Sequence, residues 1–259
     1  MHPYLNTAIK AARKAGQIIN RAAENVSHLT VSQKGHADFV TEVDKMAEQV
    51  IIATLQEAYP THAFLGEESG QLGQSEHQWI IDPLDGTTNF LHGFPMYSVS
   101  IALLSGGVLT QGVVFDPVRN DLYTATRGCG AFLNDRRIRV SSQERFDRAL
   151  IGTGFPFSTM LHQDRYLAVF REVMRQSAGI RRPGSAALDL AMVAAGRYDG
   201  FWELALKPWD IAAGCLLIKE AGGLVTDLDG EQNYLDSGHV VAGSPRIFAH
   251  LLRIIKETT

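Results

Sequence analysis

The sequence predicts an α+β fold that is built in layers. Two segments near its start, about 5–23 and 42–58, place apolar residues at the spacing of amphipathic helices. Residues 97–126 read as short strands separated by turns, which is typical of an antiparallel meander. Beyond a polar stretch at 141–148, strands and helices alternate, as they do in a layered α/β unit. We therefore expect one domain over residues 1–259, with an N-terminal half at about 1–146 and a C-terminal half at about 147–259.

The N-terminal half is expected to begin with two helices. The first, at 5–23, carries small and aliphatic residues on one face and most of its basic residues elsewhere. The second, at 42–58, starts at a capping box that Thr41 and Asp44 form, and it ends at Tyr59-Pro60. On this spacing alone, Asp44 is a helix-start acid that the helix dipole stabilises.

Turn signals between short apolar runs define the other elements. A strand at 62–65 ends in the glycine-flanked segment 66–70, and residues 71–77 are expected to be an exposed loop. Gly196 ends one helix of the C-terminal half, and Ser244-Pro245 starts the last one. The expected elements of this half are strands at 150–152, 200–203, 224–226 and 240–242, and helices at about 164–177, 186–195, 209–221 and 245–256.

Composition and charge exclude several classes of protein. The chain has 259 residues, of which 45% are hydrophobic and 20% charged, as in ordinary globular proteins. Its net charge of −4 argues against a nucleic-acid binder that works mainly by electrostatics. Its two cysteines, Cys129 and Cys215, form neither a disulfide framework nor a metal-binding pair. Without a secretory signal or an apolar run of ~20 residues, we expect a cytoplasmic protein with no membrane contact.

The strongest chemical signal lies in residues 79–90, which read WIIDPLDGTTNF. The apolar residues at the start of this stretch predict a strand that ends at Asp82, because Pro83 has no N–H for further pairing. The glycine and threonines that follow predict a tight turn opening a helix. Two carboxylates, Asp82 and Asp85, would then stand beside unpaired backbone N–H groups. Carboxylates bind Mg²⁺ and helix-start N–H groups bind phosphate, so this stretch indicates phosphoryl chemistry.

Other acids near the ends of elements can complete such a site. Glu67 and Glu68 follow the strand at 62–65, although two acids between glycines are often only a solvated turn. Asp210 stands at the start of a helix, where an acid also has a purely structural explanation. With Glu67, Asp82, Asp85 and Asp210 as oxygen ligands, two or three Mg²⁺ ions could hold both the attacking water and the leaving oxygen.

The residues after Asp85 suggest how water and phosphate would be held. The hydroxyl of Thr87 would orient the attacking water, and the amides of Gly86 and Thr87 would hold the phosphate oxygens. No cysteine or histidine lies in this stretch, which favours a metal-activated water over a covalent intermediate on either residue. An aspartyl-phosphate enzyme with Asp82 as nucleophile is the alternative. The Asp-x-Asp-x-Thr spacing of such enzymes is longer here by one residue, which would displace Asp85.

Four ordered motifs resemble those of the inositol monophosphatase family, and the similarity extends over essentially the whole chain. Residues 82–89 (DPLDGTTN) are similar to its first signature, and residues 209–214 (WDIAAG) with 220–223 (EAGG) to its second. Residues 38–44 (DFVTEVD) and 66–69 (GEES) also match, in the family's order. The resemblance implies a layered αβαβα sandwich and a single catalytic domain. It also implies Mg²⁺-dependent hydrolysis of a phosphate monoester, usually with inhibition by lithium.

The resemblance assigns metal ligands and catalytic residues to this chain. Glu67, Asp82 and the Leu84 carbonyl would bind a first Mg²⁺, and Asp82, Asp85 and Asp210 would bind a second. Glu67 would also touch a third, weaker ion and would help Thr87 to activate water.

Substrate contacts and a supporting group of residues follow from the same resemblance. Gly86 and Thr87 would bind the phosphate, and Ala186, Glu203 and Asp210 would line the inositol side. Asp44 would act beside Glu67 and Thr87 in catalysis. It belongs to a supporting group near the metals that also contains Lys34, Asp38 and Thr41.

The expected substrate is myo-inositol 1-phosphate, a small phosphorylated polyol. Fructose-1,6-bisphosphate and 3′-phosphoadenosine nucleotides are alternatives, because relatives that hydrolyse them share the metal core. A function of another class is also open, since close bacterial relatives are associated with transcription antitermination through RNA polymerase and its factors. The resemblance further implies a homodimer.

Overall fold

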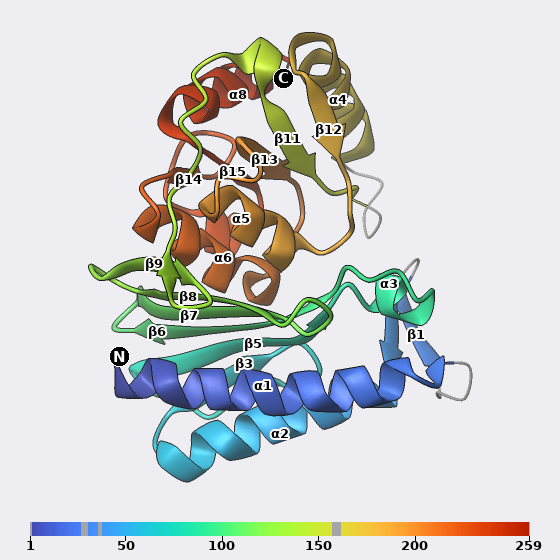
Figure 1. Cartoon of the computed structure of the whole chain (residues 1–259), viewed down its shortest axis with the longest axis vertical. Coiled ribbons are helices and arrows are strands. Elements are labelled where there is room, and N and C mark those ends of the chain that lie inside the picture. The colour runs from blue at the N-terminus through green and yellow to red at the C-terminus, as the bar shows by residue number, and fades with distance from the viewer. Residues whose placement is uncertain (1, 27–30, 36–37, 157–161, 259) are drawn as a thin grey trace.

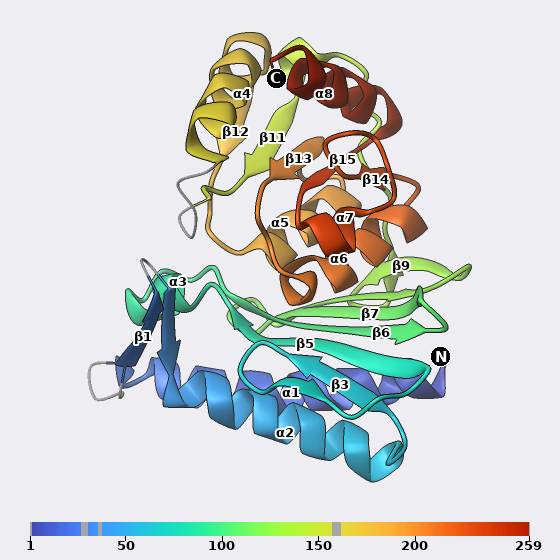
Figure 2. The same ribbon diagram turned by 180° about the vertical axis from the view of Figure 1, so that it is seen from behind.

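Five layers of helices and sheets are stacked along the long axis of the molecule (Figure 1). The computed structural model describes residues 2–26, 31–35, 38–156 and 162–258. Helices α1 (Pro3–Ala23) and α2 (Glu42–Ala58) form one outer layer on the larger sheet. Helices α5 (Ala186–Ala194) and α6 (Pro208–Glu220) fill the middle layer, and α4 (Gln163–Gln176) and α8 (Pro245–Glu257) cover the smaller sheet. Figure 2 shows the same order of layers from behind, which confirms the predicted αβαβα sandwich.

The larger sheet belongs to the N-terminal half of the chain. Its eight strands are ordered β10-β9-β8-β7-β6-β5-β3-β4, and only β3 and β5 are parallel neighbours. The meander predicted from the turn signals is therefore confirmed. The strands are β3 (Ala63–Gly66), β4 (Gly70–Leu72), β5 (His77–Asp85), β6 (Ser98–Ser105), β7 (Val108–Asp116), β8 (Asp121–Thr126), β9 (Gly130–Leu133) and β10 (Arg136–Arg137).

The smaller sheet belongs to the C-terminal half. Its five strands are ordered β12-β11-β13-β15-β14, with β11 parallel to both of its neighbours and β15 antiparallel to both of its own. The strands are β11 (Leu150–Thr153), β12 (Gly179–Arg181), β13 (Gly200–Glu203), β14 (Leu224–Thr226) and β15 (Val240–Gly243). The remaining described elements are short: the antiparallel strands β1 (Val31–Gly35) and β2 (Asp38–Thr41), helices α3 (Thr87–Leu91) and α7 (Tyr234–Ser237), and the 3-10 helix η2 (Phe146–Arg148).

Several details differ from the predictions, and strands β1 and β2 and helix α7 were not predicted. Strand β5 does not end at Asp82, because an irregularity in pairing passes over Pro83 and Leu84 and lets Asp85 pair again with Ser98 of β6. Part of the expected loop at 71–77 is strand β4, which closes a hairpin on β3. Strand β12 was not predicted, because its three residues carry no alternation that a sequence pattern could reveal.

Helix α6 lies unusually close to the larger sheet where it crosses β7. A Cβ atom built on Gly112 would lie 3.1 Å from the carbonyl oxygen of Ala213 and 3.3 Å from its Cα atom. Both atoms belong to the backbone of α6, so a side chain at residue 112 would push the helix outward. Gly112 therefore sets the separation of the sheet from the helix that carries Asp210. No helix in the described part of the chain is long and apolar enough to cross a membrane.

We expect Gly112→Ala to lower the free energy of unfolding by about 1–3 kcal/mol, because the added methyl group overpacks a contact with backbone atoms. Gly179→Ala is the matched control, since a Cβ atom there would meet its nearest neighbours at 3.5 and 3.6 Å, in ordinary contact. Urea unfolding followed by circular dichroism compares the two variants. Equal stabilities would contradict the close packing of α6.

Candidate active site

The predicted site residues come together where the larger sheet meets the N-terminal ends of α5 and α6. Asp82 and Asp85 lie at the end of β5, and Glu67 directly follows the neighbouring strand β3. Asp210 lies in the first turn of α6. The four carboxylates act on one another electrostatically, because the charges of Glu67, Asp85 and Asp210 all raise the pKa of Asp82. One site is thus assembled from both halves of the chain.

The irregularity in the pairing of β5 at Pro83 and Leu84 orients the side chains of Asp82 and Asp85. The N–H of Leu84 donates to Asp82 Oδ1 at 2.9 Å, which holds this buried carboxylate back against its own strand. Asp85 Oδ2 accepts from the Ser185 hydroxyl at 2.6 Å and from the Ala187 N–H at 2.8 Å. The start of α5 therefore contributes two donors to Asp85, and no role of Ser185 was predicted from the sequence.

Burial and mutual repulsion make these acids hard to ionise in the protein alone. Burial, followed by the neighbouring charges, raises the pKa of Asp82 well above its usual value. Burial raises the pKa of Asp85 to about 6, against the opposing effect of the hydrogen bonds from Ser185 and Ala187. Burial and then the charge of Asp85 raise the pKa of Asp210. The site therefore brings several acids together in a buried region, where each opposes the ionisation of the others.

Asp44 forms hydrogen bonds both at the start of α2 and with Thr87 of the candidate site. Its Oδ2 atom accepts from the N–H of Thr41 at 2.9 Å and from the Thr41 hydroxyl at 2.6 Å, which completes the capping box of α2. Its Oδ1 atom accepts from the Thr87 hydroxyl at 3.0 Å, and Thr87 lies equally close to the carbonyl oxygen of Leu84. Burial raises the pKa of Asp44, although these hydrogen bonds favour its ionised form.

Asp210 is held by the same local device at the start of α6. Its Oδ2 atom accepts from the N–H of Lys207 at 2.7 Å, three residues earlier. Glu203 ends β13 in the same region, and its pKa is raised by burial and then by the charges of Asp210 and Asp85. Gly154 leaves room for Glu203, since a Cβ atom on Gly154 would overlap the Glu203 carboxylate.

Glu48 is a buried acid of α2 that the predictions missed. Its Oε2 atom accepts from the N–H of Glu68 at 3.0 Å, and its Oε1 atom accepts from the N–H of Ser69 at 2.8 Å. These bonds fix the turn that carries Glu67. An acid beside the apolar residues Ala47 and Ile51 of α2 is the signal in the sequence that could have revealed it.

Gly86 occupies a position that only glycine fits well. Its φ of +95° lies in the left-handed region, and a Cβ atom there would lie 2.9 Å from the carbonyl oxygen of Met96. The turn before α3 therefore packs directly on neighbouring backbone. The side chains of Lys34 and Asp38, which were predicted to support the metal site, lie outside the described part of the chain.

The donors of this site fit a hard divalent cation. Among the described residues, no three Asp, Glu, His or Cys side chains already surround a single ion position. Asp82, Asp85 and Asp210 each use one oxygen for a donor of the protein, which leaves the second oxygen of each for a ligand. An oxygen-only set of mutually repelling carboxylates is the kind of site that Mg²⁺ or Ca²⁺ prefers. A bound cation would relieve the repulsion that raises their pKa values.

We expect ionisation of Asp85 to destabilise the metal-free protein as the pH rises. Its pKa of about 6 in the folded protein exceeds its usual value of 3.8, so the folded state binds more protons between these values. Relative to wild type, Asp85→Asn should therefore gain about 1–3 kcal/mol in the free energy of unfolding between about pH 4 and about pH 6.5. Urea unfolding in the presence of a chelator at several pH values measures this difference.

Histidines act in the opposite direction over part of this range, because burial lowers the pKa of His62, His239 and His250. They are present in both proteins, so their titration cancels in the difference, which reports Asp85 together with the acids whose pKa values its charge raises. Asp164→Asn, at an exposed position of α4, is the control for the same chemical change outside the site. A difference for Asp85→Asn that stays constant with pH would contradict the raised pKa.

Comparison with known proteins agrees with the fold. A model of the inositol monophosphatase family matches residues 1–259. A putative Nus factor SuhB from Neisseria meningitidis serogroup B is 54% identical over 257 residues, which cover 98% of each chain. An inositol-1-monophosphatase from Mesorhizobium japonicum is 51% identical over 255 residues, covering 98% of this chain and 96% of the relative. The solved extragenic suppressor protein suhB from Bartonella henselae is 48% identical, with a TM-score of 0.94 over 97% of this chain and 98% of that one. The chain therefore belongs to the inositol monophosphatase family.

Proposed function

We propose that the protein hydrolyses a phosphate monoester in a Mg²⁺-dependent reaction, with myo-inositol 1-phosphate as its substrate. The observation that carries this proposal is the cluster of four acids beside the hydrogen-bonded pair of Thr87 and Asp44. Membership of the family supports a phosphatase. The name of the Mesorhizobium relative, an inositol-1-monophosphatase, supports the choice of substrate.

The metal would be held by the oxygen donors that the site already contains. Glu67, Asp82 and the Leu84 carbonyl would form one position, and Asp82, Asp85 and Asp210 a second. When bound, Mg²⁺ supplies positive charge for the phosphate oxygens and makes a water molecule a better nucleophile. The hydrogen bonds from Ser185 and Lys207 to Asp85 and Asp210 would keep these carboxylates oriented while their second oxygens bind metal.

Thr87 and Asp44 form a route for a proton away from the attacking water. The Thr87 hydroxyl has one proton, which it shares between Asp44 Oδ1 and the Leu84 carbonyl, both at 3.0 Å. Its oxygen can therefore accept a hydrogen bond from water while its own proton points to Asp44. Asp44 is a suitable acceptor, because burial raises its pKa. Glu67 would assist from the opposite side of the cluster.

The two ends of the substrate would contact different halves of the chain. The amides of Gly86 and Thr87, at the start of α3, would hold the phosphate oxygens. Ala186, at the start of α5, and Glu203, at the end of β13, would line the polyol side. A carboxylate that accepts hydrogen bonds from hydroxyl groups selects a polyol over an apolar group.

We expect phosphate release from myo-inositol 1-phosphate to depend on added Mg²⁺ and to be inhibited by lithium. Asp210→Asn should lower kcat/KM by about 100-fold or more, since it removes one charge from the proposed metal site. Asp164→Asn is the matched control and should leave kcat/KM unchanged. Colorimetric phosphate detection measures all of these rates.

Fructose-1,6-bisphosphate and a 3′-phosphoadenosine nucleotide serve as competing substrates in the same assay. Faster release from either of them would replace the inositol ester as the preferred substrate. No Mg²⁺-dependent release from any of the three would refute the proposed activity.

A second candidate function comes from the names of relatives, several of which are Nus factors. We propose that this protein also binds RNA polymerase or its antitermination factors, and that binding does not require the metal site. Asp82→Asn should then abolish phosphate release while leaving capture of RNA polymerase in a pull-down unchanged. Loss of capture in this variant would show that the two roles are linked. The homodimer and the cytoplasmic location stay predictions.

A further inference from the structure

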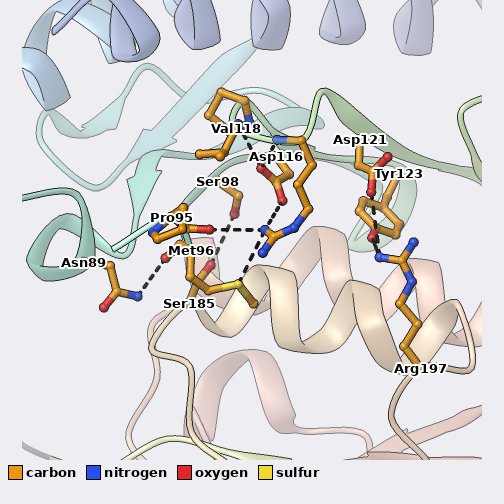
Figure 3. Close-up of polar contacts among 12 residues, drawn as sticks. Asn89, Pro95, Met96, Ser98, Asp116, Val118, Asp121, Tyr123, Ser185 and Arg197 are labelled. Atoms are coloured by element: carbon orange, nitrogen blue, oxygen red, sulfur yellow. Dashed lines mark hydrogen bonds and ion pairs between the residues drawn. The ribbon is translucent and has the colours of Figure 1, made fainter. Parts of the chain in front are cut away.

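Asn89, in α3, forms a set of hydrogen bonds, and the proposed reaction assigns no role to this residue. Its Nδ2 atom lies 2.7 Å from the carbonyl oxygen of Met96, 2.8 Å from that of Pro183 and 3.2 Å from that of Gly184. Carbonyl oxygens only accept hydrogen bonds, so these three neighbours identify the nitrogen side of the amide. Figure 3 shows Asn89 directed towards Met96, close to Ser185.

The Met96 side of this contact is braced from another direction. Arg119 Nη1 donates to the Pro95 carbonyl at 3.2 Å and to Asp116 Oδ2 at 2.7 Å. It also lies 3.8 Å from the sulfur of Met96 (Figure 3). The segment before β6 is therefore fixed to the turn that joins β7 and β8. Met96 is therefore held in place without Asn89. The partner segment that depends on Asn89 is residues 183–184.

That segment enters the candidate active site one residue later. Ser185 and Ala187 donate to Asp85 Oδ2, and Ala186 lies between them. The carbonyl oxygen of Gly184 lies 3.2 Å from the Cβ position of Gly86, so this segment also packs on the turn that would hold phosphate. Residues 183–187 are thus attached to the N-terminal half by Asn89 upstream and by Asp85 downstream, and the Ser185 hydroxyl also lies 3.5 Å from that of Ser98 in β6.

The attachments to Asn89 and to Asp85 differ in chemistry. Asp85 Oδ2, which accepts from Ser185 and Ala187, belongs to a carboxylate that is itself a proposed ligand of the metal. The amide of Asn89 is neutral at every pH and binds only carbonyl oxygens. Its hold on residues 183–184 is therefore independent of the charge state of the site.

We propose that Asn89 is a positioning residue that keeps residues 183–187, and with them Ala186, in place on the polyol side of the site, whether or not metal is bound. The expected effect of Asn89 on substrate binding rests on the proposed function, whereas its effect on the position of residues 183–187 does not. The predicted consequence is weaker binding of the polyol part of the ester, while the phosphate, held by Gly86 and Thr87, binds as before.

The test uses Asn89→Asp, which keeps the shape of the side chain but turns a carboxylate oxygen towards three carbonyl oxygens. Asn89→Ala is the second variant, in case the first does not fold. Gln232→Glu is the matched control. It makes the same chemical change outside the site, at an amide that donates to the Val225 carbonyl at 3.2 Å.

Hydrogen–deuterium exchange of peptides that cover residues 183–190, measured without metal, is the first readout. Loss of the hydrogen bonds of Asn89 should speed exchange there by about tenfold. The second readout is KM for myo-inositol 1-phosphate, which should rise by about tenfold, with the inhibition constant of inorganic phosphate changed by less than about twofold. The control should change neither.

Unchanged exchange at 183–190 in both variants would overturn the proposal. An equal loss of affinity for the ester and for inorganic phosphate would also overturn it, since that pattern indicates general damage to the site. If the wild-type protein releases no phosphate from any ester, the proposed function fails. The exchange measurement then still decides whether Asn89 holds residues 183–187.

Discussion

Repulsion among four acids is the constraint on which the rest of this structure depends. Glu67, Asp85 and Asp210 are close enough to Asp82 to raise its pKa together, and the four acids come from the turn after β3, from β5 and from the start of α6. Such an arrangement is unfavourable for the protein alone and persists only where the surrounding fold fixes every member. Its natural complement is a divalent cation, which converts the repulsion into binding energy.

The fold fixes these acids through backbone donors. Asp44 and Asp210 occupy equivalent positions in two helices, and in each the Oδ2 atom accepts from the backbone N–H three residues earlier. In Glu48 the carboxylate fixes the backbone instead. This buried side chain accepts from two N–H groups and so holds the turn that carries Glu67. One oxygen of each capping acid is thereby used for structure, and the other oxygen of Asp44 accepts from Thr87. Under the proposed function, helix capping and ligand binding would share the same side chains.

Both halves of the chain are needed to complete the site, and a small number of contacts sets their relative position. Gly112 lets α6 approach the larger sheet, which places Asp210 near Asp82 and Asp85. Ser185, Ala187 and the carbonyl groups bound to Asn89 attach the start of α5 to the same region. Two independently folded lobes with a solvent-filled cleft between them would leave these acids exposed to water. In this fold the acids are buried, and burial raises their pKa values.

The sequence by itself determined the elements and the identity of the acids. Helical spacing, the capping box at Thr41 and the turn residues placed nearly every helix and strand, since these signals arise from neighbours along the chain. The motif at residues 82–89 and its partners identified the family, and the family model confirmed it. Only the tertiary structure decided which groups orient those acids. Ser185 meets Asp85 across 100 residues, and Glu48 meets Ser69 across 21. The continuation of β5 past Pro83 could not be predicted from the sequence either, because it depends on pairing with the neighbouring strand β6. Contacts of this kind depend on how layers pack, which no local pattern records.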